Sequence, residues 1–77
     1  MIEGILGYRA ETDRFGLLVG DLWKNNDGFH CGDSLKIKIN GEWIKTRIEM
    51  TVKGDWYLCN TKLHGMDLNM LPARIET

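Results

Sequence analysis

The chain has 77 residues, of which 43% are apolar and 27% charged, and its ten basic and eleven acidic side chains leave a formal net charge of −1. A chain of this size can form only one small core, so we expect a single small β domain over residues 1–77. Its longest apolar run, residues 56–59, is far below the roughly 18 residues that a membrane-spanning helix needs, so we expect no association with a membrane.

The N-terminal third contains two predicted strands. Residues 1–9 hold an early acid and no continuous apolar segment, unlike a secretory signal, so we expect a cytoplasmic location. Residues 2–9 predict a strand, 10–14 a polar turn, and 15–19 a second strand that continues to about Trp23. The glycines of this region are too irregularly spaced for a phosphate-binding loop, and we expect them at sharp bends of the sheet.

The middle of the chain predicts a β-hairpin. Residues 34–39 alternate apolar residues with lysines, which is typical of a strand with one buried face. Asn40-Gly41 follows at once and is the preferred pair for a two-residue hairpin turn. Residues 42–52 continue the same alternation and form the returning strand.

Residues 53–55 form the next predicted turn and lead into an aromatic strand at 56–59. A three-residue loop would turn Trp56 and Leu58 inward, opposite Val52 and Met50, and this is the register that we prefer. A two-residue loop would instead bring Tyr57 and Cys59 inward.

Near the C-terminus, apolar residues in 63–71 have helical spacing, but Gly65 and the short span favour a single helical turn. Pro72 ends this turn, and residues 73–76 can form a closing strand that pairs with the first. The chain is therefore predicted to be all-β: a small SH3-like barrel or strongly curled antiparallel sheet of five to six short strands, with at most one short helical turn near residues 63–71.

Three short motifs stand out: Gly41-Glu42-Trp43, Thr46-Arg47-Ile48-Glu49 and Trp56-Tyr57-Leu58, followed by a terminal strand close to Arg74-Ile75. They resemble the motifs of a small family from Gram-positive bacteria that is known only as a domain of unknown function. The resemblance covers most of the chain, although residues 63–72 are longer and richer in methionine than the family pattern. It implies an all-β fold and no activity.

Metal and catalytic sites are not predicted. His30, Cys31, Cys59 and His64 could supply a zinc set, but His30 and Cys31 are adjacent, and neighbours on a strand point to opposite faces. Cys31 beside His30 and Asp33 lacks a predicted cleft for thiolate catalysis. We therefore expect no enzyme, no cofactor, and no catalytic or metal-binding residue, and we expect both cysteines to remain thiols.

A basic face is the clearest candidate binding surface. The predicted hairpin register places Lys36 opposite Lys45, and one face of the hairpin collects Lys36, Lys38, Trp43, Lys45 and Arg47. Such a face could hold single-stranded nucleic acid or another anionic ligand, with cations at phosphates and a base stacked on the tryptophan. Solvated lysines that only keep a strand soluble are the alternative.

A protein partner or homodimer is the other possibility, and it ranks first because the net charge is slightly negative. It is indicated by large apolar residues beyond the needs of one small core: Trp23, Trp56, Tyr57, Met66, Met70 and Leu71. These residues could also simply fill and plug the fold. The sequence thus predicts a non-enzymatic interaction module, with nucleic acid as the second choice of partner.

Overall fold

The computed structural model describes residues 1–25 and 27–76 and confirms the all-β prediction. The strands are β1 (Ile2–Arg9), β2 (Arg14–Val19), β3 (Leu22–Trp23), β4 (Ser34–Ile39), β5 (Glu42–Met50), β6 (Trp56–Leu58) and β7 (Pro72–Ile75). They form one antiparallel sheet in the order β3-β2-β1-β7-β4-β5-β6. The single helical turn in this part of the chain is η1, a 3-10 turn over Gly65–Leu68.

The sheet has seven strands rather than five or six, because the second predicted strand is split. Gly20 has a φ of +61° and turns the chain between β2 and β3, so that Leu18 and Val19 pair with Trp23 and Leu22. A positive φ is readily adopted by glycine and interrupts a strand, which is why the expected continuous run to Trp23 becomes a short hairpin.

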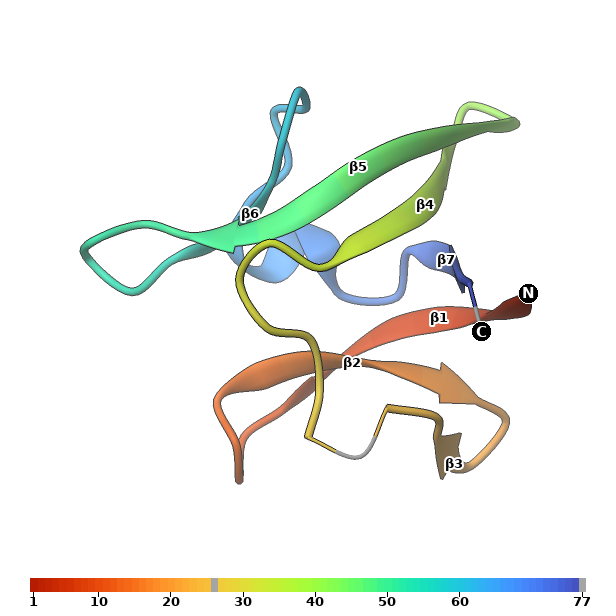
Figure 1. Cartoon of the computed structure of the whole chain (residues 1–77), viewed down its shortest axis with the longest axis horizontal. Helices are drawn as coiled ribbons and strands as arrows, with labels where there is room; N and C mark the ends of the chain where they lie inside the picture. Colours follow the sequence, from red (N-terminus) through yellow and green to blue (C-terminus); the bar gives the residue numbers. More distant parts are fainter. Residues whose placement is uncertain (26, 77) are drawn as a thin grey trace.

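The sheet curls into two layers that are joined by the last strand. Figure 1 shows β1, β2 and β3 in one layer and β4, β5 and β6 in the other, with β7 between them. β7 pairs with β1 on one side and with β4 on the other, so the predicted pairing of the last strand with the first is confirmed. This pairing also places the two ends of the described chain side by side (Figure 1).

The core lies inside the curl and draws on both layers. Its fully buried members include Leu6 and Leu17 from one layer and Ile37 and Ile48 from the other. Leu68 of η1 is also fully buried, and β6 and β1 both contact this turn. The helical turn therefore fills the open end of the curl rather than adding a further layer.

The edge strand β6 contacts the hairpin of β1 and β2 through side chains, without pairing to it as a strand. The indole Nε1 of Trp56 in β6 donates a hydrogen bond of 3.0 Å to the backbone oxygen of Asp13, which lies in the turn between β1 and β2. The guanidinium of Arg14 also lies 5.7 Å from the centre of a Trp56 ring. Side chains thus connect the two layers here, and among the described residues β3 and β6 do not pair with each other to close a barrel.

The predicted registers agree with the structure in the first hairpin and differ in the second. Lys36 faces Lys45 and Lys38 faces Trp43, as expected from the two-residue turn. In the second hairpin Met50 faces Trp56, so Trp56 and Leu58 do point inward, but Val52 is fully exposed in a longer loop. The loop closes early because the Thr51 N–H donates to the Asp55 oxygen at 2.8 Å.

Glycines of the N-terminal strands make room for neighbours, and not only for bends. Gly7 and Gly16 face each other across β1 and β2, and a β-carbon on either would lie 2.9 Å from the ring of Trp23. The indole of Trp23 thus packs on a backbone surface without side chains. The guanidinium carbon of Arg9 lies 4.9 Å from the centre of a ring of this indole. Covering exposed strand glycines with an aromatic ring stabilises the sheet there.

Candidate functional site

A row of four charged side chains crosses the outer surface of the sheet. Glu3 of β1 faces Arg74 of β7, Arg74 faces Lys36 of β4, and Lys36 faces Lys45 of β5. Facing residues on neighbouring strands project from the same side of a sheet, so these side chains form one line. One acid is thus followed by three cations.

The acid at the end of the row neutralises only its nearest neighbour. Glu3 Oε1 accepts a hydrogen bond of 2.8 Å from Arg74 Nε, and the two side chains thereby form an ion pair. For Lys36 and Lys45, no ion pair forms with any residue of 1–25 or 27–76. Two lysines directly opposite each other weaken a sheet, so an anion placed between them would relieve a repulsion already present in the fold.

These cations surround a shallow cavity of about 280 Å³. Its walls include Lys36, Lys45 and Arg74, with one acid, Glu76, and the residues Ser34 and Leu35 at the start of β4. The cavity therefore combines three positive side chains with one negative one. This arrangement suits a carboxylate or phosphate group, which can accept hydrogen bonds from several cationic donors at once.

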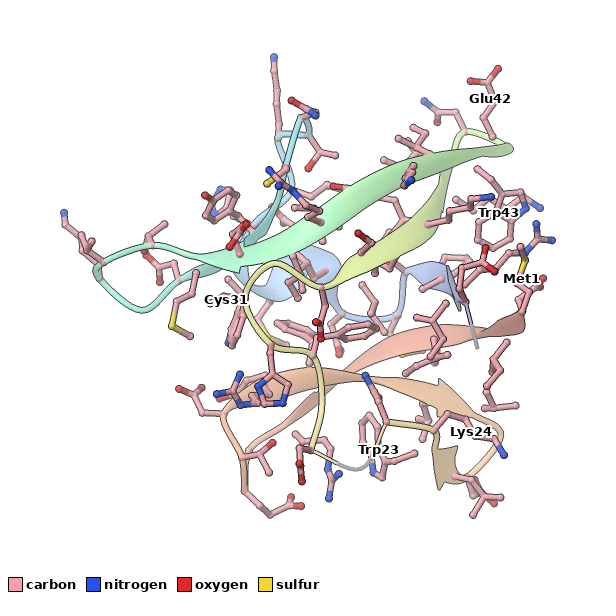
Figure 2. All side chains as sticks on the ribbon, in the orientation of Figure 1. Met1, Trp23, Lys24, Cys31, Glu42 and Trp43 are labelled. Atoms are coloured by element: carbon pink, nitrogen blue, oxygen red, sulfur yellow. The ribbon has the colours of Figure 1, made fainter. Side chains whose placement is uncertain are left out.

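Trp43 lies at the edge of this surface with its ring already in contact with cations. The guanidinium carbon of Arg74 is 3.8 Å from the ring centre, and Lys38 Nζ is 5.8 Å away. Figure 2 shows Trp43 close to the tip of the β4–β5 hairpin, at the end of the molecule where Met1 also lies. A base that stacked against Trp43 on the side of Arg74 would have to displace the guanidinium.

The structure brings all five predicted residues to one surface and adds a sixth. We call the cations of this surface the basic face: Lys36, Lys38, Lys45, Arg47 and Arg74. Arg74 was absent from the predicted set. The sequence indicated that residues 73–76 form a closing strand, but it did not indicate that this strand pairs with β4. The alternation of Ala73, Arg74 and Ile75 was the available signal, since it places Arg74 on the solvent side once the strand is assigned.

The other candidates of the sequence are dispersed. Trp56 is buried and Leu71 packs at the margin of the core, whereas Met66 and Met70 are about two-thirds exposed. Cys31 is exposed and Cys59 half-buried, and both are free thiols. No group of three or more His, Cys, Asp or Glu that could hold a metal ion occurs in the part of the chain that the structure describes.

Within that same part, 1–25 and 27–76, no helix has the length and apolar character needed to cross a membrane.

Comparison with known proteins identifies the family and leaves its activity open. A crystal structure of a protein from Ruminococcus gnavus, a structural genomics target, is similar, with a TM-score of 0.74 and 31% sequence identity; the match covers 96% of this chain and 100% of that one. No curated protein matches the chain. The family described as "Domain of unknown function (DUF5348)" matches residues 4–75. The chain therefore belongs to the DUF5348 family, as its motifs led us to expect.

Proposed function

We propose that this protein is a non-enzymatic interaction module that binds an acidic segment of a partner protein on its basic face. The observation that carries the proposal is the cavity between Lys36, Lys45 and Arg74, in which the two lysines oppose each other across β4 and β5. A fold that maintains this repulsion gains stability when an anion occupies the cavity. Electrostatic attraction of this kind also accelerates the encounter with a partner of opposite charge.

An acidic protein segment is favoured over single-stranded nucleic acid by the environment of Trp43. Proteins that bind single strands use aromatic rings on which bases can stack. Here the ring is in contact with Arg74 at 3.8 Å, and no second aromatic ring contacts that of Trp43 among the described residues. Carboxylates need only the cations, which remain accessible on the basic face.

A bacterial cytoplasm is the location that we propose for this interaction. Both cysteines are free and one is exposed, which suits a reducing compartment.

The proposal is tested by titrating the isotope-labelled protein with a deca-glutamate peptide and, separately, with a ten-residue oligo-deoxythymidine. Amide and side-chain NMR signals are followed at low and at near-physiological salt. We expect deca-glutamate to shift the signals of Lys36, Lys45 and Arg74, with an affinity that falls as salt rises, because exposed charges are screened. Tighter binding of the oligonucleotide, centred on Trp43, would assign the face to nucleic acid instead.

Two charge-matched double variants provide the control. Lys36→Gln with Lys45→Gln removes the central cations, whereas Lys53→Gln with Lys62→Gln removes two exposed lysines outside the basic face. Both lower the net charge equally, so only the first should abolish the shifts if the cavity is the binding site. Silence toward both probes at low salt, or equal losses in the two variants, would contradict the proposed function.

A further inference from the structure

The outer edge of β5 is partly unpaired. β5 pairs with β4 from Glu42 to Arg47, but β6 covers its other side only from Ile48 to Met50. Among the described residues, no strand pairs with Glu42–Thr46 on the side away from β4 (Figure 1). A strand edge of this kind offers backbone donors and acceptors to an added strand.

The backbone groups of alternate residues point toward this free edge. The Arg47 oxygen accepts a hydrogen bond of 3.0 Å from the Cys59 N–H, so the Arg47 carbonyl points away from β4. Backbone groups alternate in direction along an antiparallel strand, and those of Lys45 and Trp43 therefore point the same way. The two-residue turn at Asn40 and Gly41 leads to the same assignment, because its flanking pair is hydrogen-bonded within the hairpin.

The side chains along the edge indicate what kind of strand it accepts. Trp43, Lys45 and Arg47 project on the basic face, while Ile44 packs against the margin of the core on the other side. An antiparallel second copy centred on Lys45 would place Lys45 opposite its own counterpart and add further cations around it. Like charges directly opposite are unfavourable, so this register is disfavoured for a second copy, whereas an acidic strand meets Lys45 with the opposite charge.

We propose that the acidic segment of the partner adds to β5 as a short extra strand along Glu42–Thr46. This inference rests on the proposed function and specifies how the segment is held. Acidic residues at alternate positions would lie beside Lys45 and the cavity, and the intervening residues would lie beside Ile44. The expected ligand is therefore an extended segment that alternates acidic and apolar residues, as in other cases of β-strand addition.

A pair of capped heptapeptides tests the mode of binding. One, the valine peptide, alternates glutamate and valine, and the other has the same sequence with every backbone nitrogen methylated, which keeps the charge and the side chains and removes the backbone donors needed for pairing. We expect the valine peptide to bind at least tenfold more tightly and to slow hydrogen exchange at the Trp43 and Lys45 amides. Binding of both peptides with equal affinity and without this protection would overturn strand addition while leaving anion binding intact.

Two variants at one position separate backbone from charge on the protein side. Lys45→Gln removes the cation, and Lys45→Pro removes the cation together with an N–H that points away from β4, so the hairpin hydrogen bonds are retained. We expect Lys45→Pro to bind the valine peptide at least fivefold more weakly than Lys45→Gln, with the amide spectrum of β4 unchanged. Equal affinities would overturn the inference. If Lys45→Pro fails to fold, the peptide pair still decides, and failure of both peptides to bind wild-type protein would reject the proposed function itself.

Discussion

Arg74 covers the ring of Trp43, with its guanidinium carbon 3.8 Å from the ring centre, while its Nε donates to Glu3. One side chain of the last strand therefore joins the hairpin of β4 and β5 to β1. These contacts link three strands that are far apart in the sequence. They also orient the guanidinium beside the cavity, so the same residue contributes to the fold and to the basic face.

Replacement of Arg74 by glutamine should lower stability. The variant loses a partly exposed cation–π contact of about 0.5–1 kcal/mol and a surface ion pair worth up to about 1 kcal/mol. For a domain of this size, a loss of 1 kcal/mol lowers the melting temperature by about 4–8 °C, which circular dichroism measures directly. Arg47→Gln is the matched control. Arg47 lies on the same face but has no ring contact or ion pair among the described residues. This variant should therefore change the free energy of unfolding by less than about 0.5 kcal/mol. Equal melting temperatures for Arg74→Gln and wild type would refute the structural role.

Replacement of Lys36 by glutamate should have opposite effects on stability and binding. The variant replaces a repulsion with Lys45 by an attraction and places an acid beside Arg74, so the free energy of unfolding should rise by up to about 1 kcal/mol. This gain should shrink in high salt. Deca-glutamate binding should be lost at the same time. Thermal melts in low and high salt check the first expectation, with Lys53→Glu in the exposed loop as the control; a lower melting temperature for Lys36→Glu would contradict it.

The fold could be predicted from short-range patterns where one signal dominated. The alternating lysines of β4 and the Asn40-Gly41 turn specified both a strand and its register, because a shift of one residue would bury the lysines. The second hairpin had no equivalent turn signal. There, hydrogen bonds between Thr51 and Asp55 set the loop length, and nothing in residues 53–55 indicated that Val52 would leave the strand.

The candidate site was predictable only within one hairpin. Lys36, Lys38, Trp43, Lys45 and Arg47 are neighbours through β4 and β5, which follow each other in the chain. Arg74 reaches this face through pairing of β7 with β4, a contact between residues nearly 40 positions apart that depends on how the whole sheet curls. Local periodicity carries no information on such a contact, and the cavity that depends on Arg74 could not be foreseen either.

Tyr8 should titrate above its ordinary pKa of 10.0. Its hydroxyl donates a hydrogen bond to the Asp13 carboxylate, which stabilises the neutral phenol, and partial desolvation and the negative charge of Asp13 raise the pKa further. A pKa raised by folding adds stability below the unfolded value, and that stability is lost as the pH rises through the folded pKa. NMR titration of the labelled Tyr8 ring checks the shift. Asp13→Asn, which tolerates the positive φ of 53° at this position, should move the pKa back toward 10.0, and an ordinary pKa in the wild type would contradict the contact.

The packing of Trp23 on the glycine pair predicts strong coupling between positions 16 and 23. In Gly16→Ala the new methyl group would lie 2.9–3.0 Å from two ring carbons of Trp23, so the ring must move, at a cost of about 1–3 kcal/mol. In a Trp23→Ala background the ring is gone and, of the three atoms nearest to the new methyl group, only Asn25 Oδ1 remains, at 3.3 Å, so the same change should cost less, because alanine loses less conformational entropy than glycine. Chemical denaturation of the four proteins of this cycle should therefore give a coupling energy of at least about 0.5 kcal/mol.

Gly32→Ala provides the control cycle with Trp23→Ala. Gly32 has a φ of +90°, and no atom of the described residues lies within 4 Å of the position that a β-carbon would take, so alanine there is penalised by its backbone alone. That penalty does not depend on Trp23, and the coupling energy should be near zero. Additive effects in the Gly16 cycle would show that the indole does not rest on the glycine pair. The two cycles differ only in the contact between the Trp23 ring and position 16. Equal coupling energies in both cycles would therefore indicate a general loss of stability in Trp23→Ala instead of this contact.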